Sequence, residues 1–154
     1  MAIGYQEVRI VSAGRGESLV GLQFYICRQD GTNPVDGRTY RFPKDAADVA
    51  SCDVLLPPAA PLAFHDPTQF CAAQERRETT IDRKTGFPRF KTNSQTGKHI
   101  VLALPKELTL EEQRRLACDW ARSQYVDHGV AAIVAVHHPD DPATGNAHAH
   151  ILIS

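Results

Sequence analysis

The sequence has no long hydrophobic run. No stretch approaches the roughly 20 apolar residues that a membrane-spanning helix needs, and the opening MAIGYQEVRI lacks the basic-then-apolar pattern of a secretory signal. It also has no excess of charge of one sign: the formal net charge is −1, which gives no global attraction to nucleic acids or membranes. These absences favour a cytoplasmic protein with no membrane partner. The 154 residues fit one domain.

Cysteines are few and scattered. Cys27, Cys52, Cys71 and Cys118 form no C-x-x-C pair and have no regular spacing. In a cytosolic protein such cysteines are expected to be reduced and mostly buried as small apolar groups. A cysteine metal site is therefore not favoured.

The order of patterns along the chain mixes strands with helices. Apolar runs and alternating apolar and polar residues predict strands over residues 3–12, 38–43, 52–56, 99–104, 131–137 and 147–153. Apolar residues at helical spacing, together with capping residues, predict helices over 18–29, 67–79 and 109–128. Thr109 and Glu112 have the spacing of a capping box. Residues 80–98 are expected to be mostly irregular, with a β-hairpin as the alternative. This pattern predicts an α+β fold with a central, mainly antiparallel sheet and helices packed on one face.

Three histidines near the end of the sequence are predicted to share one sheet face. Side chains alternate along a strand, so His148 and His150 point to the same side, and His137 is in register with them if its strand lies in the same sheet. Three imidazoles would leave open coordination positions, which is typical of a catalytic metal site. The alternative is an ordinary pair of strand histidines with no ligand role.

The remaining histidines are not assigned to this site. His138 would point to the opposite face unless Pro139 has already ended the strand, so His137 is preferred as the third ligand. His65, His99 and His128 have no histidine neighbours in the expected pattern and are taken as incidental.

The chain resembles the MobA/MobL family of plasmid mobilisation relaxases. The resemblance is carried, in order, by SAGRGES, LVGLQFYICR, DVLLP, ALPKELT and the terminal NAHAHILIS with its H-x10-H-x-H spacing. These segments span almost the whole chain. The resemblance implies a relaxase domain over residues 1–154 with an RRM-like palm, belonging to a longer protein whose C-terminal portions are absent here.

The resemblance also implies a chemistry. In this family a tyrosine on the first helix attacks a phosphodiester of single-stranded DNA at an origin of transfer and keeps the 5′ phosphate. Tyr25 occupies the matching position, whereas Tyr5 and Tyr40 lie in strand-like segments. His137, His148 and His150 would hold a divalent ion (Mn, Mg or Zn) that offsets charge at phosphorus. No other small-molecule cofactor is expected, and accessory mobilisation proteins are candidate partners.

A basic stretch lies between Glu75 and Lys98. This stretch holds seven basic and three acidic residues, so its local charge is +4. Those assigned to DNA binding are Arg76, Arg77, Arg83, Lys84, Arg89 and Lys91, which would contact phosphates near the nick. Phe87 and Phe90 could stack on unpaired bases. A solvated loop without a ligand is the alternative.

One departure from the family and two rival functions stay open. Many members have an acidic residue two positions before the ALP segment, where this chain has Val101, so the group that orients a ligating histidine is unassigned. The first rival is a small hydrolase in which the same three histidines activate water. The second is an inactive, truncated DNA-binding remnant.

Overall fold

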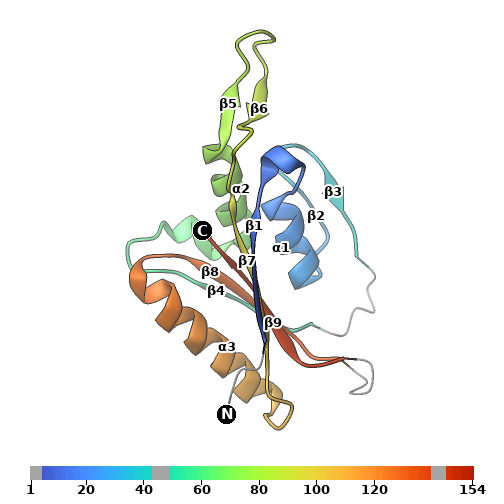
Figure 1. Cartoon of the computed structure of the whole chain (residues 1–154), viewed down its shortest axis with the longest axis vertical. Coiled ribbons are helices and arrows are strands. Elements are labelled where there is room, and N and C mark those ends of the chain that lie inside the picture. The colour runs from blue at the N-terminus through green and yellow to red at the C-terminus, as the bar shows by residue number, and fades with distance from the viewer. Residues whose placement is uncertain (1–4, 43–48, 140–144) are drawn as a thin grey trace.

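A five-stranded antiparallel sheet forms the centre of the protein (Figure 1). The computed structural model describes residues 5–42, 49–139 and 145–154. In spatial order the strands are β1 (Gln6–Val11), β7 (Gly97–Ala103), β9 (His148–Ile153), β8 (Ala132–His137) and β4 (Val49–Leu55), and every neighbouring pair is antiparallel. The α+β class and the antiparallel sheet are as the sequence predicts.

Helices cover both faces of this sheet, so the expectation of a single helical face is wrong. α3 (Leu110–Gln124) packs on one face, and α1 (Leu19–Cys27) and α2 (Pro67–Arg77) pack on the other (Figure 1). The reason lies in β8, where Val134 faces the α3 side and Ile133 the α1 side, both fully buried. A strand that is apolar on both sides must be covered on both sides.

α1 is enclosed almost completely. Ser18 caps its first turn by accepting from the Gly21 N–H, and the helix ends before Arg28, which adopts a left-handed conformation with φ of 50°. α1 packs against both the sheet and α2, so most of its residues are buried; Leu22 is half-buried, and Tyr25 is 44% exposed. α3 has the predicted capping box between Thr109 and Glu112.

Two short hairpins lie outside the main sheet. One pairs β5 (Thr79–Ile81) with β6 (Pro88–Phe90), which confirms the hairpin alternative for the basic stretch, and the other pairs β2 (Gly31–Thr32) with β3 (Thr39–Tyr40). Single 3-10 turns are η1 (Ala13–Arg15), η2 (Leu62–His65) and η3 (Val126–His128). Among the helices of the described residues, none has the length and apolar character to cross a bilayer.

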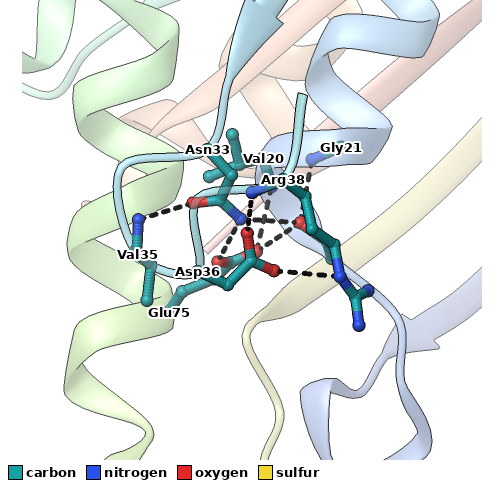
Figure 2. Close-up of polar contacts among 8 residues, drawn as sticks. Val20, Gly21, Asn33, Val35, Asp36, Arg38 and Glu75 are labelled. Atoms are coloured by element: carbon teal, nitrogen blue, oxygen red, sulfur yellow. Dashed lines mark hydrogen bonds and ion pairs between the residues drawn. The ribbon is translucent and has the colours of Figure 1, made fainter. Parts of the chain in front are cut away.

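A buried carboxylate joins α2 to the start of α1 (Figure 2). Glu75 is 1% exposed and accepts from the Ser18 hydroxyl at 2.8 Å, the Val20 N–H at 3.1 Å and the Asn33 amide at 3.0 Å. Asn33 in turn accepts from the Val35 N–H at 2.8 Å. The N-terminus of a helix favours a negative charge, so this carboxylate is stabilised where it is buried.

Replacing Glu75 with Gln should destabilise the protein by about 2–3 kcal/mol. The amide would remove the charge and would place N–H groups against donors that now bind a carboxylate. Urea unfolding followed by circular dichroism measures the change. The matched control is Glu111→Gln, a 68% exposed side chain with one weak ion pair to Arg114, whose loss should cost less than about 1 kcal/mol. Equal effects would contradict the assigned role of Glu75.

A disulfide joins the end of α1 to β4. Cys27 is bonded to Cys52, whereas Cys71 and Cys118 are free thiols. The expectation that all four cysteines are reduced is therefore wrong for this pair. Antiparallel pairing brings β4 beside β8, where α1 packs, and the two cysteines meet there although 25 positions separate them in sequence.

Replacing Cys52 with Ser should lower the free energy of unfolding of the oxidised protein by about 3.5 kcal/mol, the loop-closure value for a cross-link between residues 25 positions apart. Urea unfolding without reductant measures the loss, and dithiothreitol should bring the unmodified protein to the same stability. Cys118→Ser is the control, since that thiol is unbonded. A Cys52→Ser protein as stable as the oxidised parent would refute the cross-link.

Candidate metal centre and nucleophile

The end of β8 and the start of β9 bring three histidines together. His137 pairs directly with His148, and His150 pairs with Ala135, so all three rings lie on the α1 side of the sheet. One nitrogen of each ring lies within 4.8 Å of the others. His137 and His150 are only 2% and 9% exposed. The strand alternation that selects these residues in the sequence holds in the structure.

Backbone carbonyls fix the orientation of two of these rings. His137 Nε2 lies 2.6 Å from the Ile26 oxygen, and His148 Nδ1 lies 2.8 Å from the Asn146 oxygen. A carbonyl only accepts, so these nitrogens carry the ring protons. The lone pair is then on Nδ1 of His137 and on Nε2 of His148, as a metal ligand requires.

The third ring contacts a fourth histidine. His150 Nδ1 lies 2.8 Å from His99 Nε2, the two rings stack with centroids 5.1 Å apart, and His150 Nε2 lies 3.1 Å from His148 Nε2. The sequence pattern predicts that His99 is incidental, and this contact with His150 shows that the prediction is wrong. His99 lies on β7, which is adjacent to β9, and the pairing of the two strands puts both side chains on the same face.

Burial keeps the two stacked rings neutral. It lowers the pKa of His150 to about 3, with further effects from His137, His148, His99 and Arg28. Burial, followed by the charge of Arg9, lowers the pKa of His99 to about 4. Both imidazoles are therefore uncharged near pH 7, which is the form that binds a metal ion.

The other three histidines lie outside this cluster. His138 Nδ1 contacts Gln113 Oε1 at 3.3 Å on the α3 side, the face that alternation predicts for it. His65 ends η2 and His128 ends η3. The preference for His137 over His138 thus agrees with the geometry.

Tyr25 lies beside the histidines at the end of α1. Its ring meets the His150 ring edge-on with centroids 6.4 Å apart, and it meets Phe42 at 6.1 Å. The other two candidate tyrosines are engaged elsewhere. Tyr5 donates to the Glu7 carboxylate at 2.9 Å, and Tyr40 packs on Phe24 with centroids 5.8 Å apart. Tyr25 is thus the tyrosine whose ring contacts the histidine cluster.

Arg28 adds a cation that the sequence analysis does not single out. Its guanidinium carbon lies 4.5 Å from the Tyr25 ring centroid, and its Nη1 donates to the Tyr25 carbonyl at 2.9 Å. Burial chiefly lowers the pKa of His150, and the charge of Arg28 adds a smaller effect. The available sequence signal is its place three residues after Tyr25, on the same side of the helix end.

The basic residues proposed for DNA binding gather elsewhere. Arg76 and Arg77 end α2, and Arg83, Lys84, Arg89 and Lys91 lie on or next to the β5–β6 hairpin. In Figure 1 this hairpin projects from one end of the molecule, whereas the β8–β9 strand ends with the histidines lie toward the other end. Three of the six have acidic neighbours: Arg89–Asp82 at 3.2 Å, Arg77–Glu78 at 3.8 Å and Lys91–Glu78 at 3.9 Å.

The residues present fit a divalent metal ion. Three imidazole nitrogens on adjacent strands match the ligand set of Zn²⁺ and of other first-row ions, and they leave coordination positions open for a substrate oxygen. Two rings already hold the required tautomer through carbonyls. The Tyr25 ring lies against the His150 ring, and the Arg28 guanidinium lies against the Tyr25 ring. This arrangement suits chemistry at a phosphate.

Comparison with known proteins identifies relatives over the whole chain. The chain is 32% identical to "Probable mobilization protein MobA" of Bifidobacterium longum and 27% identical to "Mobilization protein MobL" of Acidithiobacillus ferridurans, in each case over all of this chain. These matches cover 25% and 43% of the relatives, so the chain spans less than half of their length.

The fold and the family model agree with these matches. A solved structure described as "Molecular Basis of Vancomycin Resistance Transfer in Staphylococcus aureus" superposes with a TM-score of 0.81 at 20% identity, over 99% of this chain and 70% of that one. The model of the MobA/MobL family matches residues 18–154, from the cap of α1 to the end of β9. The chain belongs to the MobA/MobL family.

Proposed function

We propose that this domain nicks single-stranded DNA at an origin of transfer, with Tyr25 as the nucleophile. The observation that carries the proposal is the contact between the half-exposed Tyr25 ring and His150, a member of the three-histidine cluster. A nucleophile and a metal site that serve one phosphate must lie side by side. Membership of the MobA/MobL family supports the same reading.

The reaction exchanges one phosphodiester for another. The Tyr25 oxygen loses its proton and bonds to phosphorus, while the bond from phosphorus to the 3′ oxygen breaks and that oxygen leaves as a hydroxyl. The 5′ phosphate stays on the tyrosine. Because one ester replaces another, the 3′ hydroxyl can reverse the step without ATP. Because the substrate would be DNA, we expect the reaction to take place in the cytoplasm, with accessory mobilisation proteins as partners.

Each side chain has a role in this proposal. A divalent ion held by His137, His148 and His150 would polarise the non-bridging phosphate oxygens. A tyrosine hydroxyl has an ordinary pKa of about 10 and needs a nearby cation to favour attack. Arg28 is such a cation, since its guanidinium lies against the ring of Tyr25. It is also positioned to bind phosphate oxygens.

The hairpin supplies a second DNA contact. Arg83 and Lys84 are exposed near its tip, and Phe87 beside them is 72% exposed. Phosphate contacts by the cations and stacking by the aromatic ring are sequence-tolerant ways to hold a single strand. Since the hairpin and the histidines lie toward opposite ends of the molecule, we infer that it binds DNA away from the nick.

Replacing Tyr25 with Phe should abolish the covalent protein–DNA adduct and leave metal binding unchanged. The assay incubates the protein with single-stranded origin DNA and Mn²⁺, then resolves the adduct on a denaturing gel, with EDTA as the metal-removal arm. Tyr40→Phe is the control and should keep the adduct. Cleavage by the Tyr25→Phe protein without any adduct would point to metal-activated water instead. An adduct formed by that variant would disprove the choice of nucleophile.

Replacing Arg83 and Lys84 together with Gln should weaken binding of single-stranded DNA. Each lost phosphate contact should reduce the slope of log K against log salt by about 0.7, so the pair should reduce it by about 1.4. Fluorescence anisotropy over a salt series measures both effects. The matched control replaces Lys106 and Arg115, exposed residues before and on α3, with Gln. Similar losses for both pairs would argue against a specific role of the hairpin.

A further inference from the structure

His150 differs from the other two candidate ligands in what holds its second nitrogen. His137 and His148 are held by carbonyls, which only accept, whereas His150 Nδ1 contacts His99 Nε2 at 2.8 Å. A ring nitrogen either donates or accepts, so the tautomer of His150 depends on what determines the tautomer of His99.

Arg9 determines the tautomer of His99. Arg9 lies on β1 directly opposite His99 on β7, and its Nε–H donates to His99 Nδ1 at 3.3 Å. A guanidinium has donors and no acceptor, and it stays charged at all relevant pH values. Nδ1 of His99 must therefore carry the lone pair, and the ring proton is on Nε2.

The direction of donation then continues along the cluster. His99 Nε2–H donates to His150 Nδ1, so the His150 proton is on Nε2. That nitrogen faces His148 Nε2 at 3.1 Å, which accepts because His148 donates through Nδ1 to the Asn146 carbonyl. Every donor in this series of hydrogen bonds, from Arg9 through His99, His150 and His148 to Asn146, thus meets an acceptor.

This arrangement opposes coordination by His150. The nitrogen that faces the other two rings carries a proton, whereas a ligand must present a lone pair there. We propose that Arg9 and His99 are positioning residues that hold His150 in the tautomer that cannot bind a metal ion. Metal binding would then reverse the direction of the hydrogen bonds from His99 to His150 and release Arg9 Nε from His99. This inference rests on the proposed metal site.

The reversal conserves protons. His150 releases its Nε2 proton to solvent and takes the Nε2 proton of His99 on its own Nδ1. His99 then takes a proton from solvent on Nδ1, where Arg9 Nε–H had been bonded. Arg9 keeps a second partner throughout, because its Nη1 contacts Glu17 Oε1 at 3.0 Å. The reversal therefore removes two hydrogen bonds of the metal-free site, from Arg9 to His99 and from His150 to His148, and the first of these opposes binding through Arg9.

Nuclear magnetic resonance of ¹⁵N-histidine-labelled protein tests the tautomers directly. After EDTA treatment and dialysis near pH 7.5, His99 and His150 should both be protonated on Nε2. With Zn²⁺ as the probe, both should be protonated on Nδ1. A His150 that is already protonated on Nδ1 without metal would overturn the proposal, as would a His99 that keeps its Nε2 proton when Zn²⁺ is bound.

A double-mutant cycle separates the hydrogen bond from the charge of Arg9. Arg9→Met should tighten the Kd for Zn²⁺ by about 3- to 10-fold, the factor expected for one opposing hydrogen bond. In a His99→Gln background, where the amide can rotate to accept from His150, Arg9→Met should give no further gain. An equal gain in both backgrounds would assign the effect to charge alone and contradict the proposal. Circular dichroism checks that each variant is folded.

Different results would overturn the proposed metal site and the proposed role of Arg9 and His99. Absence of Zn²⁺ binding would remove the proposed metal site, and this inference with it, even with the metal-free tautomers as predicted. Normal Zn²⁺ binding with the opposite metal-free tautomers would overturn the role of Arg9 and His99 and leave the metal site intact. Neither readout involves DNA, so neither depends on whether Tyr25 is the nucleophile.

Discussion

The antiparallel pairing of β8 with β9 is the constraint on which the candidate site depends. In the observed register His137 lies opposite His148, and His150 follows on the same face. A slip by one residue would turn His148 and His150 toward α3 and the isoleucines of β9 toward α1. Such a slip would bury polar rings in an apolar cluster, so core packing and site geometry specify the same register.

The helix that carries Tyr25 is fixed at both ends by contacts of different kinds. At its start, the buried Glu75 carboxylate binds the Ser18 cap and the Val20 N–H. At its end, Cys27 is bonded to Cys52 of β4, and the Ile26 carbonyl contacts His137. The same residues that hold the helix therefore hold Tyr25, the proposed nucleophile, against the histidine cluster.

Side-chain alternation is a local rule, so it predicts which residues of one strand share a face of the sheet. It selects His137, His148 and His150 and excludes His138 from the same face. The role of His99 depends on β7 being adjacent to β9, a pairing between segments about 50 residues apart that no local pattern specifies. The Cys27–Cys52 bond depends on sheet order in the same way. The error about the helical layers has another cause: β8 is apolar on both sides, which periodicity alone does not resolve.

The β5–β6 hairpin forms its own two-stranded sheet and shares no ladder with the five strands of the core. Insertions, deletions or changes of charge in it therefore leave the pairing of the histidine strands untouched. The architecture is modular in this respect: the part that would choose where DNA is held can diverge among relatives while the part that would cut it stays the same. A different way of holding a DNA strand could then arise in this fold without rebuilding the histidine cluster.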